Sequence, residues 1–262
     1  MGTSISELDA VSAAADTVLR LPEPPRRLRR PSLFLDLDGV LAHLAATPDA
    51  VVPDAGRTAV LRAVTERLGG RVAIISGRTI AEIDRIAEAS VGSASGVHGL
   101  ERRLAGGEMQ RAEPAEAVRD AVAAFEDFAR TRPGVVVEDK AVAAGLHFRG
   151  APDAASDAEA LTRRLADQTG LSLQPGNMVI ELKTPGASKG TAVKSFMAEA
   201  PFAGGTPVML GDDLTDEHGF QAAADLGGFG VLVGPPRDTA ARYGLHDVEA
   251  VLAWLSAVEE DA

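Results

Sequence analysis

Residues 33–41 read LFLDLDGVL, and this stretch indicates the fold of the 262-residue chain. The apolar run at 33–37 is typical of a strand that is buried on both faces of a sheet. Two carboxylates, Asp36 and Asp38, stand at its carboxyl end. Because ligands of open α/β sheets bind beyond the carboxyl ends of parallel strands, this placement predicts a parallel α/β core with a polar crevice at these residues.

Strand-like and helix-like segments alternate along the chain on either side of a different middle part. The expected strands are 72–75, 208–210 and 229–233, and the expected helices are 55–69, 79–89, 215–224 and a last one that carries Val248, Val251, Leu252 and Leu255 on one face. This βαβα order predicts a Rossmann-like parallel sheet that is covered by helices on both sides.

The middle of the chain has a different order of expected elements, in which a helix and two strands are followed by a second helix and two more strands. The helices are expected near 114–131 and 156–168, and the strands at 135–139, 144–149, 171–174 and 178–183. We expect these strands to form an antiparallel sheet of their own. The chain is thus predicted to hold an N-terminal arm at 1–30, a core at 31–104 and 186–262, and an inserted αββαββ unit at 105–185.

The N-terminal arm ends in a basic cluster that consists of Arg26, Arg27, Arg29 and Arg30. A short helical pattern and a proline-rich stretch precede it. Such a cluster can bind an anionic partner or can be solvated, and charge runs are usually solvated. We therefore favour an arm that leads into the first strand over a binding patch.

Composition restricts the classes of function. The chain has 26 Lys and Arg against 38 Asp and Glu, so its net charge of −12 works against binding of nucleic acid or an anionic membrane. It has no Cys, which excludes disulfides, thiolate metal sites and a cysteine nucleophile. No apolar run approaches the roughly 20 residues of a spanning helix, and the first residues lack a signal-peptide pattern. We expect a cytoplasmic protein without a membrane or nucleic-acid partner.

Three polar signals each follow an apolar strand. They are Asp36-Leu37-Asp38-Gly39, Ser76-Gly77-Arg78 and the segment GDDLTD at 211–216. The carboxyl ends of parallel strands lie along one edge of a sheet, so these distant segments are expected to converge on one crevice. A single Asp at a strand end is usually a turn or cap residue, but this combination is not explained by turns alone.

The predicted crevice would bring together Asp36, Asp38, Asp212 and Asp216. Several carboxylates in one place repel one another unless a cation compensates them. Oxygen-only ligands, with neither Cys nor paired His, favour Mg²⁺. The sequence therefore predicts a magnesium cofactor at this site.

Lys189 follows Ser188, a good N-cap residue, at the start of an expected helix at 189–199. A lysine in this position is unfavourable against the helix dipole, whereas an anion gains from both the dipole and the lysine. Lys189 is thus a candidate phosphate-binding residue, although a lone lysine is more often solvated.

Four of these segments, in order, resemble the motifs of the haloacid-dehalogenase-like phosphohydrolases: DLDGVL at 36–41, Ser76, Lys189 and GDDLTDE at 211–217. Three further stretches are similar to the trehalose-6-phosphate phosphatase family, namely GVHGLE at 96–101, EDKAVAAGLHFR at 138–149 and MVIELKTPGASKG at 178–190. The resemblance runs from about residue 31 to 235. It implies hydrolysis of trehalose 6-phosphate in trehalose biosynthesis.

The resemblance also implies the roles of the core residues. Asp36 would be the nucleophile that accepts the phosphoryl group, and Asp38 would protonate the leaving sugar oxygen and then activate water. Ser76 would hydrogen-bond the phosphoryl group and Lys189 would neutralise its charge.

The same resemblance implies the metal ligands. Asp36, the backbone carbonyl of Asp38 and Asp212 would hold Mg²⁺. Either Asp216 or Asp213 would complete the site, directly or through an intervening group.

The inserted unit would be a cap that closes over the sugar. The residues that match the family's sugar contacts are Glu138, Lys140, Arg149, Asn177 and Glu181. Without the resemblance, ion pairs on a strand face would be the preferred interpretation of the charged members of this set. Two histidines, His98 and His147, lack metal-ligand spacing and are expected to be structural.

Other functions stay open from the sequence. Asn177 stands where many bacterial members of the family have Lys, which leaves room for another sugar phosphate such as sucrose 6-phosphate or mannosyl-3-phosphoglycerate. A catalytically silent partner of a synthase, a phosphomutase or a receiver-like switch would share part of the acidic cluster. Asp38 favours turnover, because a simple switch has no need of a second carboxylate. The oligomeric state is left undetermined.

Overall fold

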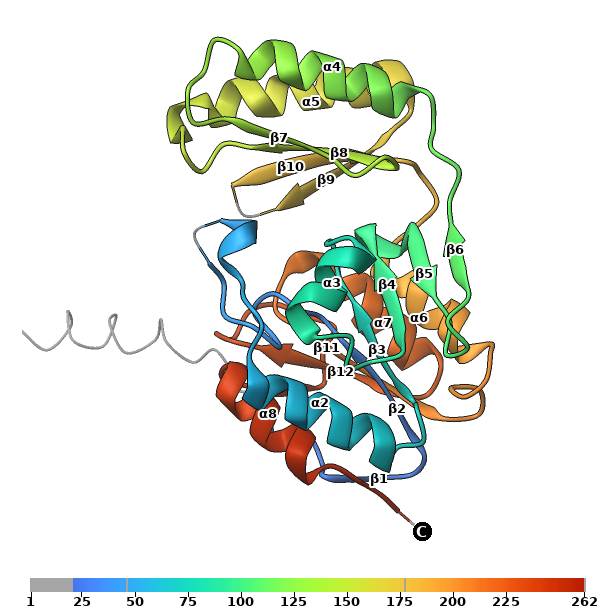
Figure 1. The fold of residues 1–262 in the computed structure, drawn as a ribbon. Helices are drawn as coiled ribbons and strands as arrows, with labels where there is room; N and C mark the ends of the chain where they lie inside the picture. Colours follow the sequence, from blue (N-terminus) through green and yellow to red (C-terminus); the bar gives the residue numbers. More distant parts are fainter. Residues whose placement is uncertain (1–20, 46, 177, 262) are drawn as a thin grey trace, which may run out of the picture.

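The structure is a computed structural model that describes residues 21–45, 47–176 and 178–261 (Figure 1). The short helical pattern expected near the N-terminus lies almost wholly outside these residues. Asn177 also lies outside them. Of the basic cluster, all four arginines are exposed, while Leu28 between them is buried.

A mixed sheet of eight strands forms the core, in the order β13-β12-β11-β2-β3-β4-β5-β6. Six strands run parallel: β2 (Pro31–Leu35), β3 (Val72–Ile75), β4 (Ser93–Gly96), β11 (Thr206–Gly211), β12 (Phe229–Val233) and β13 (Tyr243–Leu245). Two antiparallel strands, β5 (Glu101–Arg103) and β6 (Met109–Arg111), extend one edge. The predicted α/β core with a parallel-dominated sheet is confirmed.

Strand β2 lies in the middle of this sheet, between β11 and β3. Leu33 and Leu35 pack on one face, and Phe34 packs on the other. Both faces are therefore apolar, as expected for a central parallel strand. The strand ends at Leu35, two residues before the predicted end, so Asp36 lies just beyond it.

Helices cover both faces of the sheet (Figure 1). The face of Leu33 packs against α2 (Ala55–Arg67), α3 (Ile80–Ala87) and α8 (Val248–Ala257). The face of Phe34 packs against α6 (Lys189–Met197) and α7 (Glu217–Asp225). No described helix is long and apolar enough to cross a membrane.

The inserted unit has the predicted αββαββ order. Its elements are α4 (Ala117–Ala129), β7 (Val136–Asp139), β8 (Ala143–His147), α5 (Ala155–Thr169), β9 (Ser172–Gly176) and β10 (Val179–Lys183). The strands form an antiparallel sheet in the order β7-β8-β10-β9 with a hydrophobic cluster of its own. Its two helices lie on the side away from the core, so its open face looks toward the core (Figure 1).

Short elements complete the chain. A two-stranded parallel pair joins β1 (Arg27–Leu28) to β14 (Glu259–Glu260). The 3₁₀ helices are η1 (Pro48–Ala50), η2 (Val97–Gly99), η3 (Pro152–Ala154) and η4 (Leu214–Asp216). The domain limits at 1–30, 31–104 with 186–262, and 105–185 stay a prediction.

Candidate active site

The predicted strand-end segments meet at one place. Lys189, the first residue of α6, lies with its Nζ atom 3.0 Å from Asp36 Oδ2 and 2.7 Å from Asp216 Oδ1. Asp36 directly follows β2, Asp216 is the last residue of η4 in the segment after β11, and Lys189 starts α6. The structure therefore brings together residues that are up to 180 positions apart in the sequence.

Lys189 is buried, with 3% of its side chain exposed. Ser188 and Thr191 form a capping box that fixes the first turn of α6, and this places Lys189 inside the crevice. Burial would lower the pKa of Lys189, but Asp216 and Asp36 outweigh it and the pKa is raised. The ammonium group is thus permanently charged.

Three carboxylates, from Asp36, Asp212 and Asp216, have oxygen atoms within 4.8 Å of one another. Burial raises the pKa of Asp36 well above its usual range; Lys189 opposes this, and three neighbouring aspartates, Asp216, Asp212 and Asp38, add to it. Burial and Asp216 likewise raise the pKa of Asp212 to about 7. The cluster is short of positive charge, and its oxygen-only donors suit a hard divalent cation.

Gly39 permits this close approach. It adopts a φ of +77°, which is strained for residues other than glycine. A Cβ atom in its place would lie 2.1 Å from Asp212 Oδ2. The loop after β2 can therefore touch the carboxylate that follows β11 only if this residue is glycine.

Asp216 uses both of its carboxylate oxygens within the loop. Oδ1 accepts a hydrogen bond from Lys189, and Oδ2 accepts from the backbone amides of Asp212 and Asp213 at 3.1 Å each. Asp213 is exposed and caps the amide of Leu214. Asp216 thus orients Lys189 and the loop, and its role as a metal ligand stays a prediction.

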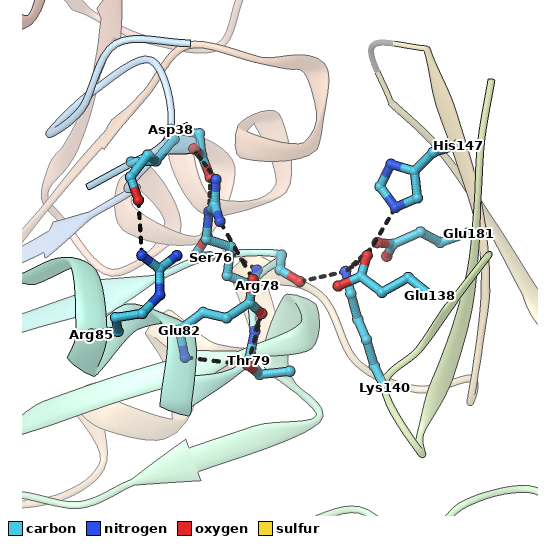
Figure 2. Close-up of polar contacts among 12 residues, drawn as sticks. Asp38, Ser76, Arg78, Thr79, Glu82, Arg85, Glu138, Lys140, His147 and Glu181 are labelled. Atoms are coloured by element: carbon cyan, nitrogen blue, oxygen red, sulfur yellow. Dashed lines mark hydrogen bonds and ion pairs between the residues drawn. The ribbon is translucent and has the colours of Figure 1, made fainter. Parts of the chain in front are cut away.

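The carboxylate of Asp38 pairs with Arg78 (Figure 2). Asp38 is not a member of the cluster formed by Asp36, Asp212 and Asp216. Arg78 Nε and Nη2 donate to its two oxygens at 2.7 and 2.9 Å. Arg78 also lies 3.4 Å from Glu82 Oε1. Such a bidentate pair fixes the direction of both side chains.

Ser76 follows β3 and is buried. Its backbone amide donates to Ser95 O at 2.9 Å, and its Oγ atom accepts from the amide of Arg78 at 3.2 Å. These bonds hold the Ser76-Gly77-Arg78 segment in a tight turn at the edge of the crevice.

A cavity of about 230 Å³ separates the core from the inserted sheet. From the core it is lined by Asp38 and Arg78 among others. From the inserted sheet it is lined by four residues that the sequence predicts as sugar contacts, namely Glu138, Lys140, Arg149 and Glu181. The fifth, Asn177, lies outside the described residues.

Lys140 is at the centre of these charged groups (Figure 2). Its Nζ atom contacts Glu181, lies 3.4 Å from Glu138 Oε2 and donates to Gly77 O at 3.0 Å. Burial would raise the pKa of Glu181 and lower that of Lys140, but their mutual attraction outweighs burial and moves both in the opposite directions. Both side chains are therefore charged.

The site also contains one residue that sequence reasoning gave no role and two histidines that it expected to be structural. Arg78 stands in the quoted tripeptide after β3 but received no role. Two histidines line the cavity: His147 Nε2 lies 2.9 Å from Glu138 Oε2, and His98 Nε2 lies 3.3 Å from Glu181 Oε2. Both histidines lie in stretches that resemble the family, at 96–101 and 138–149. This resemblance was the signal that could have placed them at the site. Their expected structural role stays a prediction.

Comparisons with known proteins agree with this geometry. The model of the trehalose-phosphatase family matches residues 34–249. The chain is 38% identical to the trehalose-6-phosphate phosphatase of Escherichia coli (strain K12), over 91% of this chain and 90% of that protein. It is 36% identical to a probable trehalose-phosphate phosphatase of Sinorhizobium fredii (strain NBRC 101917 / NGR234), over 87% of each.

A solved structure supports the fold. The crystal structure of a trehalose-6-phosphate phosphatase related protein superimposes with a TM-score of 0.70 and 26% identity, over 85% of this chain and 94% of that chain. Since the family model spans most of the chain and two relatives match nearly all of it, the resemblance seen in the sequence motifs is confirmed. The chain belongs to the trehalose-phosphatase family, whose members are phosphoric monoester hydrolases.

Proposed function

We propose that this chain hydrolyses trehalose 6-phosphate to trehalose and phosphate through an aspartyl-phosphate on Asp36. One observation carries the proposal beyond family membership. Asp38 belongs to the same loop as Asp36, yet it lines the cavity that Glu138, Lys140 and Glu181 also line. A general acid must reach both the phosphorus and the sugar oxygen, and this position allows it.

In the first step, a carboxylate oxygen of Asp36 attacks phosphorus, and the bond to the sugar oxygen breaks. Asp38 gives its proton to that oxygen, and trehalose leaves. In the second step, water attacks phosphorus while Asp38 takes its proton. Phosphate leaves and Asp36 is restored, so that each turnover consumes one water molecule.

Arg78 imposes a condition on this sequence. A carboxylate held by a guanidinium in a bidentate pair has no proton to give. To act as the acid, Asp38 must therefore leave Arg78 and carry the proton that it took from water in the previous turnover, while Glu82 at 3.4 Å offers Arg78 an alternative partner.

Lys189 and Ser76 would hold the phosphoryl group. Lys189 already lies 3.0 Å from the attacking carboxylate, so its charge also faces the phosphoryl oxygens of a bound substrate. The Ser76 hydroxyl, at the end of the neighbouring strand, would donate to another of these oxygens.

The acidic cluster fits Mg²⁺. Asp36, Asp212 and the backbone carbonyl of Asp38 would hold the ion, with Asp216 or Asp213 as further support. The observation behind this assignment is the cluster of Asp36, Asp212 and Asp216, whose carboxylate oxygens lie within 4.8 Å of one another. Burial and this crowding raise the pKa of Asp36 and Asp212 even though Lys189 lies beside them, which agrees with a shortage of positive charge. When bound, the ion would supply positive charge that draws the substrate phosphate into the site.

The inserted unit would act as a cap that reads the sugar. Glu138, Lys140, Arg149 and Glu181 line the cavity with both hydrogen-bond acceptors and donors, which suits the many hydroxyls of a disaccharide. Asn177, which belongs to the predicted set, is proposed to add a further contact. A cytoplasmic location stays a prediction.

The test is phosphate release from a panel of sugar phosphates, with Mg²⁺ and after chelation. We expect trehalose 6-phosphate to be the best substrate and chelation to stop turnover. Preference for sucrose 6-phosphate or mannosyl-3-phosphoglycerate would contradict the sugar assignment. Full activity after exhaustive chelation would contradict the metal assignment.

A further inference from the structure

Two consecutive residues that are not glycine, Val97 and His98, adopt left-handed backbone conformations with φ of 46° and 53°. A positive φ is uncommon outside glycine and is a real outlier for a β-branched residue such as valine. Such strain persists only where the surrounding structure holds it, and it concentrates at functional sites. The contacts of this turn therefore indicate what it is for.

The turn is tied to both sides of Gly77. The amide of Val97 donates to Arg78 O at 2.9 Å, and the amide of His98 donates to Ser76 O at 3.0 Å. A Cβ atom on Gly77 would lie only 2.7 Å from His98 Nε2. The imidazole ring thus rests directly on Gly77, within the segment that carries Ser76.

The same ring faces the cap. His98 Nε2 lies 3.3 Å from Glu181 Oε2, while Lys140 contacts the other oxygen of Glu181 and donates to Gly77 O. The side chains of His98, Lys140 and Glu181 are 11%, 6% and 8% exposed. Gly77 is therefore touched by His98 from the core and by Lys140 from the cap, and both of these buried side chains lie against the Glu181 carboxylate.

The charge state of His98 follows from its surroundings. Burial lowers its pKa; Glu181 opposes this, and Lys189 and Lys183 add to the lowering. A neutral imidazole that faces a carboxylate carries its proton on the facing nitrogen, here Nε2. Its Nδ1 atom is buried without a hydrogen-bond partner among the described residues. Oε2 of Glu181 is likewise buried and has no hydrogen-bond partner among the described residues, so its contact with His98 Nε2 at 3.3 Å is a close polar approach between the two side chains.

We propose that His98 is a positioning residue for sugar specificity, which fixes the Glu181 carboxylate against the Ser76–Gly77 turn. The inference rests on the proposed function. Glu181 then faces the sugar while His98 holds it against the turn that carries Ser76. If the carboxylate is misplaced, kcat/KM for the sugar substrate falls. A phosphate ester without sugar hydroxyls does not use this arrangement.

Two substitutions separate positioning from a merely structural role. Gln can place its amide nitrogen near the position of His Nε2, whereas Asn places its nitrogen near that of Nδ1. Asn tolerates left-handed backbone better than Gln. A structural role therefore predicts that His98→Asn is the milder change, and a positioning role predicts that His98→Gln is.

The experiment compares kcat/KM for trehalose 6-phosphate and p-nitrophenyl phosphate, with melting temperatures of all variants. We expect His98→Asn to lose about tenfold in kcat/KM on the sugar substrate, the size of a polar interaction with a charged group. On p-nitrophenyl phosphate its loss should stay below about threefold, and His98→Gln should recover most of the sugar activity. In Glu181→Ala, adding His98→Asn should cost nothing further, because both act through one group.

Equal losses on the two substrates, activity that follows the melting temperatures, additive losses in the double variant, or failure of His98→Asn to fold would overturn the proposal. These outcomes leave the proposed function intact as long as wild type prefers trehalose 6-phosphate. A wild type without that preference overturns the proposed function, and this inference falls with it.

Discussion

Two buried lysines, Lys189 in the core and Lys140 in the cap, each lie between two carboxylates, but the two clusters differ in charge balance. In the core, Asp212 joins Asp36 and Asp216, so three carboxylates face one lysine. In the cap, Lys140 faces two glutamates. The pKa is raised for Asp36 and Asp212 in the core, whereas in the cap it is lowered for Glu138 and Glu181.

The proposed function explains this difference by what each cluster would bind. A site for a cation and a phosphoryl group is incomplete until the cation arrives, so its carboxyl groups resist ionisation. A site for uncharged hydroxyls needs its charges balanced within the protein, because the ligand brings none. Figure 2 shows the second arrangement, in which Glu138, Lys140, His147 and Glu181 already contact one another.

The strongest test of the core cluster is Asp36→Asn. An amide neither attacks phosphorus nor supplies negative charge to a cation, so phosphate release should be abolished on every substrate. Release of inorganic phosphate at saturating substrate measures this. Asp225→Asn is a matched control, because Asp225 is exposed and pairs only with Gln221 and Lys194 in the described structure. Turnover near wild type in Asp36→Asn would remove Asp36 as the nucleophile.

The second largest effect is expected for Asp38→Asn. Asp38 is close to Asp36 of the core cluster in the sequence, and it lines the cavity that the cap cluster also lines. We expect kcat to fall by about 10² to 10⁴ on trehalose 6-phosphate, the usual size of general acid–base catalysis. The loss in the first step should be smaller on p-nitrophenyl phosphate, because nitrophenolate leaves without a proton. The measurement is the single-turnover rate at which each substrate releases its alcohol. A larger loss of this rate with trehalose 6-phosphate than with p-nitrophenyl phosphate would identify Asp38 as the general acid. An unchanged rate on the sugar substrate would exclude it.

The cap cluster is tested by Glu181→Ala, which should penalise trehalose 6-phosphate at least tenfold more than p-nitrophenyl phosphate. Groups built to hydrogen-bond hydroxyls contribute only when the hydroxyls are present. We estimate this contribution to kcat/KM at about tenfold or more. Both Glu181→Ala and Glu181→Gln remove the negative charge that faces the buried Lys140. Glu181→Gln keeps the shape of the side chain, so it separates the loss of charge from the loss of volume. The ratio of kcat/KM values is the measurement. An equal loss on both substrates would mean that Glu181 supports the fold or the core chemistry.

Much of this arrangement could be predicted from sequence, for reasons visible in particular residues. The apolar residues Leu33, Phe34 and Leu35 marked a strand buried on both faces, and the polar segments after strands marked one edge of a sheet. Both signals depend on local order and on the geometry common to parallel sheets. The convergence of Asp36 with the segment at 211–216 followed from that geometry, whereas Lys189 was a candidate because of its place at a helix N-terminus and the family resemblance.

What the sequence could not provide is which side chains pair once they converge. The pairing of Asp38 with Arg78 and the use of both Asp216 oxygens depend on rotamers and loop paths that no spacing encodes. His98 shows this most clearly. Its position depends on a left-handed turn at two residues that are not glycine, which local propensity disfavours and only tertiary contacts hold.

The smallest expected effect is the pH dependence of the stabilisation by Mg²⁺, which distinguishes the core cluster from the cap cluster. The folded pKa of Asp212, about 7, lies above the ordinary aspartate value of 3.8. Without metal, the stability that this group contributes is fully present below the lower value and is lost as pH rises through the higher one. Mg²⁺ should offset this loss, since it binds the ionised form, and at pH 5 protons compete with it.

We therefore expect Mg²⁺ to raise the melting temperature clearly at pH 8 and much less at pH 5. At 100 times its Kd the ion contributes about 2.7 kcal/mol, or roughly 5 °C for a chain of this size. Differential scanning fluorimetry with and without Mg²⁺ measures the shift, with Asp212→Asn as the variant that should lose it. Glu181→Gln should keep the shift, because the cap cluster is balanced without a cation. A shift of equal size at both pH values, or one retained by Asp212→Asn, would mean that the ion binds elsewhere and that the core cluster is not the charge-deficient site described above.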